Sequence, residues 1–267
     1  MVNIPKEKTK EDVEKKKEAT ESEKIEVESE GIEEVEETPE EKVKEIPAQQ
    51  REELTEWVPK TKLGKEIVAG KYKDIKDVLM AGEIILEPEI VDYLVPDLKQ
   101  ELIYIGGTPG KGGGIRRTPT KMTARMHKSG RRYKVSAMVV VGNENGVVGV
   151  GKAKSVEHRI AIEKALQQAK LNVIYVKRGC GSWECNCGRD HSIPFKVTGK
   201  CGSVRIMLLP SPKGVGIVAG DESKKILGLA GIKDVWIKTF GQTATRINLA
   251  AAVFDALKNL SQTKGDL

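Results

Sequence analysis

The sequence has no run of about 18 apolar residues, which is the length that a membrane-spanning helix needs. Its first residues are rich in Lys and Glu, so they do not form the apolar centre of a secretory signal. Both absences count against a membrane protein and an exported protein. We therefore expect a cytoplasmic protein with no membrane partner.

Cysteine is scarce and unevenly placed, with 4 residues in 267. Three of them, Cys180, Cys185 and Cys187, lie so close together that bridges between them would close very short loops, which argues against a disulfide framework. With His191 they offer three thiolates and one imidazole, the ligand set of a closed structural zinc site. The C-x4-C-x-C-x3-H spacing is not that of a common zinc finger, so free thiols or a redox disulfide remain alternatives.

A catalytic centre is also missing, because no Ser/His/Asp set or pair of carboxylates stands out. Two glycine-rich stretches resemble nucleotide-binding motifs imperfectly. GTPGKGGG has Ile105 where a phosphate loop has its first glycine and Gly112 where it has Ser or Thr. Gly214-x-Gly216-x-x-Ala219 has dinucleotide-fingerprint spacing, with Asp234 downstream, but little parallel sheet is expected around it. We interpret both as turns and keep a nucleotide-dependent enzyme only as an alternative hypothesis.

The two signs of charge are separated along the chain. Residues 1–50 contain 9 Lys or Arg and 17 Asp or Glu, whereas the remainder contains 36 and 22. The acidic segment has no aromatic residue and few apolar ones, which predicts a disordered tail over 1–50. Residues 51–100 contain helical apolar spacing at 74–80 and 88–94, which predicts a helical extension of short packing helices.

Residues 106–134 carry cations and no acidic residue, so they need an external anion. Glycines from Gly106 onward predict a conformationally free arm as far as Lys128. Tyr133 is the only aromatic residue in 106–134, which favours contact with the phosphates of structured RNA over stacking on single strands. The predicted phosphate-binding cations are Lys111, Arg116, Arg117, Lys121, Arg125, Lys128, Arg131, Arg132 and Lys134.

Apolar periodicity predicts an α+β fold. Residues 131–151 form a β-hairpin turning at Asn145-Gly146. A helix follows from a Ser155 cap to about 171, with His158 on its buried stripe, and then a strand at 173–176. A second unit has strands at 193–197, 203–209 and 234–238, a helix at 222–229 ended by Gly231, and a last helix at about 244–260.

Three long motifs carry a family resemblance: GRRYKVSAMVVVGNENGVVGVGKAK, IPFKVTGKCGSVRIMLLPSPKGVGIVAG and AGIKDVWIKTFGQTATRINLAAAVFDAL. They resemble the small-subunit ribosomal protein S5 family, and RGCGSWECNCG is similar to its archaeal branch. The resemblance implies a double-stranded-RNA-binding-like domain at 101–178 and a C-terminal α+β domain at 193–267 with a left-handed β-α-β crossover. The cysteine-rich linker, a possible zinc loop, occupies 179–192.

The resemblance also implies a function without catalysis. It implies binding of small-subunit ribosomal RNA, near the path by which messenger RNA enters, through the Gly130-Arg131-Arg132 loop. It further implies contact with the neighbouring small-subunit protein S4, which influences decoding accuracy, through Lys200, Cys201, Gly202 and Arg205. A free-standing RNA-binding regulator built on the same domain is the second hypothesis.

Overall fold

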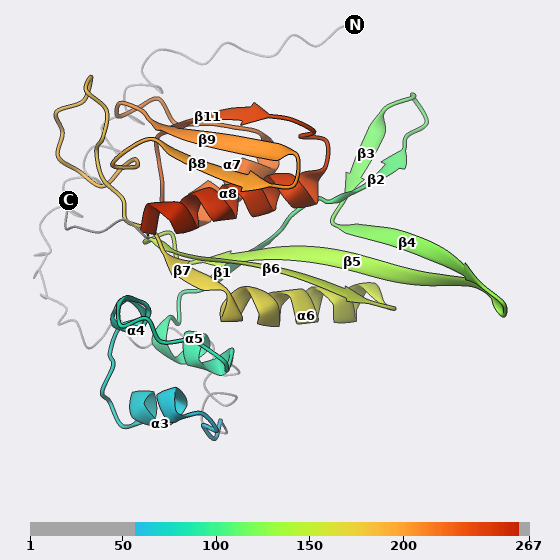
Figure 1. Ribbon diagram of the computed structural model, residues 1–267, viewed down its shortest axis with the longest axis horizontal. Coiled ribbons are helices and arrows are strands. Elements are labelled where there is room, and N and C mark those ends of the chain that lie inside the picture. Colours follow the sequence, from blue (N-terminus) through green and yellow to red (C-terminus); the bar gives the residue numbers. More distant parts are fainter. Residues whose placement is uncertain (1–56, 262–267) are drawn as a thin grey trace, which may run out of the picture. The chain divides into compact units, whose positions relative to one another are not determined.

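The computed structural model describes residues 57–261, and the predicted acidic tail lies outside this range. The described residues belong to one compact unit (Figure 1). Its helices are α3 (Lys62–Val68), α4 (Ile75–Met80), α5 (Glu89–Leu94), α6 (His158–Leu171), α7 (Asp221–Leu229) and α8 (Arg246–Ser261). Its strands are β1 (Lys99–Leu102), β2 (Gly106–Pro109), β3 (Ile115–Thr118), β4 (Thr120–His127), β5 (Gly130–Gly142), β6 (Val147–Ser155), β7 (Val173–Tyr175), β8 (Val197–Cys201), β9 (Val204–Pro210), β10 (Ile217–Val218) and β11 (Val235–Phe240). No helix among residues 57–261 is long and apolar enough to cross a membrane.

The first sheet is antiparallel and centred on β5, with the order β1-β5-β6-β7. The strands β1 and β4 share one edge of β5, where β1 pairs with 139–142 and β4 with 130–137. Both faces of the inner half of β5 are buried, because Val139 joins the core on one side and Val140 the core on the other. The sheet is therefore an internal layer, with β4 and the outer half of β5 projecting from it.

The helix α6 covers one face of this sheet at unusually close range. A Cβ added to Gly151 would lie 2.1 Å from the Ala165 carbonyl oxygen and 2.2 Å from the Ala169 nitrogen. The buried stripe of α6 consists of Ala161, Ala165 and Ala169, whose small side chains permit this approach. Glycine on the strand and alanine on the helix thus set the spacing of the two layers.

Two predictions about α6 are wrong. His158 is exposed, and its Nδ1 lies 2.8 Å from Thr120 Oγ1, so it is not a core imidazole. The N-cap is Glu157, whereas Ser155 is the last residue of β6. The strand β6 continues four residues beyond the predicted end of the hairpin at 151, and the helix begins only at His158, which therefore lies in its exposed first turn.

The second sheet has the order β10-β11-β9-β8. Its strands β10 and β11 are parallel and joined through α7, which forms the β-α-β crossover unit that the resemblance implies. The helix α7 ends before Gly231, which has φ of 76°, as predicted. The predicted strand at 193–197 is wrong, because the segment before β8 bonds instead to Gly179 and Gly181 at the start of the cysteine loop.

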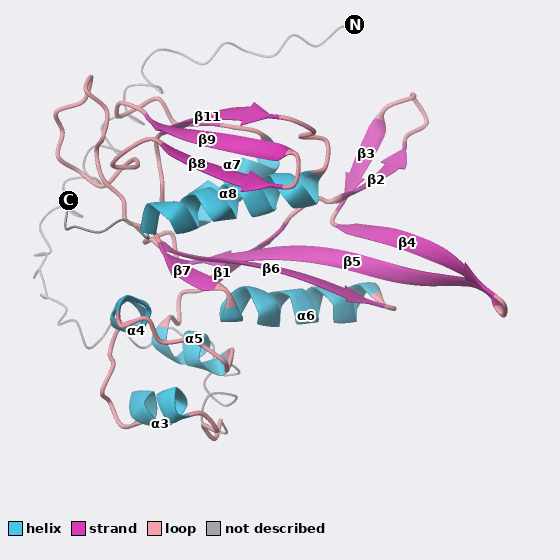
Figure 2. Ribbon diagram, in the orientation of Figure 1, coloured by secondary structure: helices cyan, strands magenta, loops and turns pink. Residues whose placement is uncertain are grey.

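The two sheets share one core. Met138 and Val140 of β5 belong to the same buried cluster as Ile226 of α7 and Leu257 of α8. In Figures 1 and 2, α8 lies between the two sheets. The chain is an α+β protein in which two sheet-and-helix units pack through α7 and α8.

The turn between β5 and β6 also differs from the prediction. Its left-handed residues are Glu144, with φ of 56°, and Gly146, with φ of 92°, rather than an Asn-Gly pair. The Asn143 Oδ1 accepts hydrogen bonds from the backbone N–H groups of Asn145 (2.8 Å) and Val147 (3.1 Å). Because the Asn143 side chain makes this turn, it begins one residue before the predicted two-residue turn. Glu144, not Asn145, therefore lies in the left-handed region.

The N-terminal helices are held by Glu87. Its carboxylate accepts hydrogen bonds from Trp57 Nε1 (3.1 Å) and from the N–H groups of Lys60 (3.0 Å) and Thr61 (2.6 Å). Burial alone would raise the pKa of Glu87, but these hydrogen bonds together lower it below its ordinary value of 4.5. The helices at 74–80 and 88–94 are confirmed as α4 and α5, whereas α3 was not expected.

Candidate RNA interface and metal-binding cluster

The β4–β5 hairpin carries its predicted RNA-binding residues in a defined register. Opposite residues of an antiparallel pair lie on the same face of the ribbon. Arg125 is opposite Arg132, and Lys134 is opposite Thr123. Because residues two apart along a strand share a face, Lys121 joins them. One face of the projecting hairpin is therefore cationic: Lys121, Arg125, Arg132 and Lys134.

The opposite face of the same hairpin is apolar and exposed. Met122, Met126 and Tyr133 alternate with the cations and have exposed fractions of 55, 78 and 48%. The guanidinium of Arg131 lies 5.4 Å from the centre of the Tyr133 ring. Arg131 therefore stands on a different face from Arg132, a distinction that charge counting along the sequence does not make.

The rest of the predicted arm is not a free loop, which corrects the expectation for 106–128. Residues 106–118 form the two-stranded β2–β3 hairpin, and 120–127 are β4. Lys111 lies at the turn of β2–β3, and Arg116 and Arg117 lie on β3 with opposite orientations. Threonine and the other β-branched residues between the glycines favour strands, so this segment forms a backbone ladder that a count of its glycines does not predict.

All nine predicted cations are exposed. Within residues 57–261 none of the nine forms an ion pair. The hairpin tip closes at Gly130, whose φ of 105° suits glycine, and Arg132 Nη2 donates to Ser129 Oγ (3.2 Å). Unpaired cations on a rigid ribbon are free to contact an external polyanion.

The predicted protein-interface residues lie together at the β8–β9 turn. Lys200 is opposite Arg205 in the ladder, and both side chains are exposed. Cys201 is half-buried, and Gly202 has φ of 59°. The backbone N–H of Lys200 donates to Asp255 Oδ2 (3.0 Å), which ties this turn to α8. The turn is therefore a fixed, basic surface feature.

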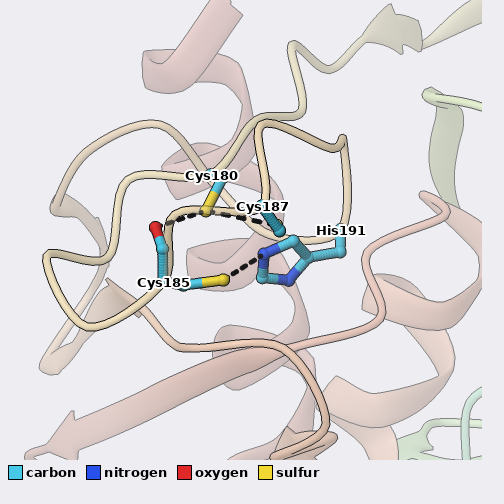
Figure 3. Close-up of side chains that lie close together, drawn as sticks. All are labelled: Cys180, Cys185, Cys187 and His191. Carbon is cyan, nitrogen blue, oxygen red and sulfur yellow. Dashed lines mark hydrogen bonds between the residues drawn. The ribbon is translucent and has the colours of Figure 1, made fainter.

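The four predicted metal ligands converge, as Figure 3 shows. The sulfur atoms of Cys180, Cys185 and Cys187 and a ring nitrogen of His191 all lie within 4.8 Å of one another. The Cys180 and Cys187 sulfurs are 3.6 Å apart, and Cys185 Sγ is 3.6 Å from His191 Nε2. For tetrahedral zinc, with bonds of about 2.3 Å to sulfur and 2.0 Å to nitrogen, these separations are about 3.8 and 3.5 Å. The donor set fits a metal ion.

The cysteine loop is closed at its base. Gly179 and Ser192 exchange two backbone hydrogen bonds of 2.9 Å, and the Gly181 N–H donates to the Ile193 carbonyl (3.2 Å). A Cβ at Gly181 would lie 2.0 Å from the Pro194 carbonyl oxygen, so this position requires glycine. The closed base brings His191 back beside the cysteines that precede it.

The thiols differ in acidity. The pKa of Cys185 is lowered to about 6, chiefly by a hydrogen bond from the backbone of Lys213 and next by one with Cys187. The pKa of Cys180 is raised, chiefly by burial and to a smaller extent by hydrogen bonds with the other two thiols. A thiolate at Cys185 is the form that binds a metal ion.

Asp234 is a member of this site that sequence reasoning missed. Its Oδ2 lies 2.9 Å from His191 Nδ1, and both side chains are 6% exposed. Its Oδ1 accepts the N–H groups of Gly214 (3.0 Å) and Gly216 (2.8 Å). These glycines and Asp234 have the spacing of a dinucleotide fingerprint, but they bind one another. The other nucleotide-like stretch forms the β2–β3 turn.

Known families match both halves of the described chain. Residues 119–177 match the family model "Ribosomal protein S5, N-terminal domain", and residues 199–267 match "Ribosomal protein S5, C-terminal domain". A small ribosomal subunit protein uS5 from Methanocaldococcus jannaschii is 54% identical over 79% of this chain and 90% of its own length. The chain belongs to the ribosomal protein S5 family.

Further S5 relatives come from other archaea. The uS5 proteins of Staphylothermus marinus and Nanoarchaeum equitans are 49 and 50% identical over 78 and 79% of this chain, and over 91 and 90% of their own lengths. The matched S5 domains contain the β4–β5 hairpin and the β8–β9 turn, whereas the cysteine loop lies between 177 and 199, outside both domain models.

Proposed function

We propose that this protein is a structural constituent of the small ribosomal subunit that binds its ribosomal RNA without catalysing a reaction. The observation that carries the proposal is the cationic face of the β4–β5 hairpin, in a chain of the S5 family. Its unpaired Lys and Arg side chains displace the counterions of RNA phosphates, and the pairing of β4 with β5 fixes their spacing. Membership of this particle places the protein in the cytoplasm.

The hairpin is tested with Arg125→Ala/Arg132→Ala in the full chain. The control, Lys62→Ala/Lys65→Ala, removes the same charge from exposed positions on α3. We expect the affinity for purified small-subunit RNA to fall only in the hairpin variant. The logarithmic salt slope should decrease by about 1.4–1.8, the value for two lost phosphate contacts. Equal slopes in the two variants would contradict the proposed interface.

Sedimentation of a cell extract at low and high salt distinguishes this proposal from the alternative, a free-standing RNA-binding regulator. A ribosomal constituent travels with the small subunit at low salt. A chain that stays at the top of the gradient, yet binds duplex RNA tightly when purified, would favour the regulator.

The finer part of the proposal concerns position within the subunit. The Gly130-Arg131-Arg132 tip contacts RNA near the path by which messenger RNA enters, and the β8–β9 turn packs against protein S4. Support comes from the exposure of Lys200 and Arg205 on one face of the turn. Lys200→Glu/Arg205→Glu should weaken co-purification with S4 and raise misreading in a translation assay, whereas Lys224→Glu on α7 should do neither.

We further propose that Cys180, Cys185, Cys187 and His191 hold one structural zinc ion, with residues 179–192 as the linker between domains at 101–178 and 193–267. The convergence of the four donor atoms supports this assignment. Elemental analysis of reduced protein should find about one zinc per chain, which Cys185→Ser/Cys187→Ser abolishes and Cys201→Ser preserves. Metal-free protein after purification in zinc-containing buffer would refute it.

A further inference from the structure

The cysteine and histidine cluster is connected to residues far along the chain through Asp234. His191 and Asp234 meet twice: the His191 carbonyl accepts the N–H groups of Lys233 (2.9 Å) and Asp234 (3.0 Å), and His191 Nδ1 faces the Asp234 carboxylate at 2.9 Å. Both side chains are almost fully buried. The backbone of His191 is thus held by two hydrogen bonds, and its ring is oriented by the carboxylate at Nδ1.

We propose that Asp234 is the positioning residue of the metal site, a role that rests on the proposed metal function. An ionised carboxylate only accepts hydrogen bonds, so the proton of the neutral imidazole stays on Nδ1. The other nitrogen, Nε2, then carries the lone pair and points at Cys185 Sγ, 3.6 Å away. Asp234 thus selects the tautomer that binds a metal and aims it at the thiols.

The same carboxylate connects the metal site to the turn before β10. Its second oxygen accepts the N–H groups of Gly214 and Gly216, both of which have positive φ. The backbone of Lys213, in the same turn, lowers the pKa of the Cys185 thiol. The turn at 213–216 is therefore held beside the metal-binding cluster by the Asp234 carboxylate.

The substitution Asp234→Asn distinguishes an effect on the tautomer of His191 from an effect on packing. The amide oxygen of Asn can still accept the glycine N–H groups, but its NH2 group would donate to His191 Nδ1 and drive the proton to Nε2. The control is Asp255→Asn, which makes the same change at an exposed backbone contact on α8. Competition with a chromogenic chelator should show zinc affinity 10–100-fold lower for Asp234→Asn and unchanged for Asp255→Asn.

Two further measurements distinguish positioning from simple destabilisation. Bound Co(II) should keep its thiolate charge-transfer absorption in Asp234→Asn, while its ligand-field bands shift as the imidazole leaves. In a His191→Cys background the fourth ligand needs no tautomer, so adding Asp234→Asn should leave zinc affinity unchanged. An equal loss of affinity in both backgrounds would show that Asp234 acts through the fold alone and would overturn the proposal.

The outcomes also separate this inference from the metal site itself. If the wild-type chain binds no zinc, the proposed metal function fails, and the role of Asp234 fails with it. If the wild type binds zinc and Asp234→Asn binds it equally tightly with an unchanged Co(II) spectrum, the metal function stands and only the positioning role is wrong.

Discussion

Replacing Gly151 by Ala tests the close packing of α6 on β6. The new Cβ would lie 2.1 Å from the Ala165 carbonyl oxygen, whereas ordinary contact begins at 3.4 Å, so α6 and β6 must separate locally by about 1.3 Å. The neighbours are backbone atoms, which no side-chain rotation can move away. Overpacking of this kind costs about 1–3 kcal/mol, and we expect the upper end because a whole helix must shift.

A matched control is available in Gly228, which lies inside α7 with nothing within 4 Å of an added Cβ. There the same substitution should stabilise the protein by about 0.5–1 kcal/mol, because alanine favours a helix and restricts the unfolded chain. With a urea dependence of about 2 kcal/mol per M, Gly151→Ala should lower the unfolding midpoint by about 1 M, and Gly228→Ala should raise it. A Gly151→Ala midpoint at or above that of the wild type would refute the packing argument.

Three further predictions concern charges and the metal. Arg246→Ala removes the guanidinium that lies 2.6 Å from the Glu222 carboxylate, which is 4% exposed, and leaves it with Lys225 Nζ at 3.8 Å and the Tyr104 N–H. This should cost about 3 kcal/mol in urea unfolding, whereas Arg159→Ala, which breaks an exposed pair, should cost under about 0.5. Glu87→Gln should lower the free energy of unfolding by about 1 kcal/mol at neutral pH. The difference between wild type and variant should close as the pH falls below 4.5, because the lowered pKa of the Glu87 carboxyl stabilises the fold above that value and this effect is lost on acidification. A difference that does not change with pH would contradict this. Treating the protein with a chelator to remove the proposed zinc ion should speed amide hydrogen exchange in 179–192 and leave α6 unchanged, and uniform exchange rates would argue against a structural ion.

The predictions from sequence succeeded where the signal is local. The apolar spacing of α8 and the glycine after α7 depend on residues within a few turns of one another, and both were located correctly. The prediction for His158 failed although it uses the same periodicity. Its orientation depends on where β6 ends, and that boundary is decided by pairing with β5 rather than by the residues of the helix.

The sequence by itself determined the family, the cation-rich segment, and the three thiols with a nearby imidazole, because each is a short pattern whose chemistry is independent of distant residues. Only the tertiary structure decided which cations share a face. Strand register places Arg132 with Arg125 and turns Arg131 to Tyr133. The tertiary structure also brought Asp234 to His191, which lie 43 positions apart in the sequence. Such contacts are set by the packing of two sheets around one core, and a linear pattern carries no record of that packing.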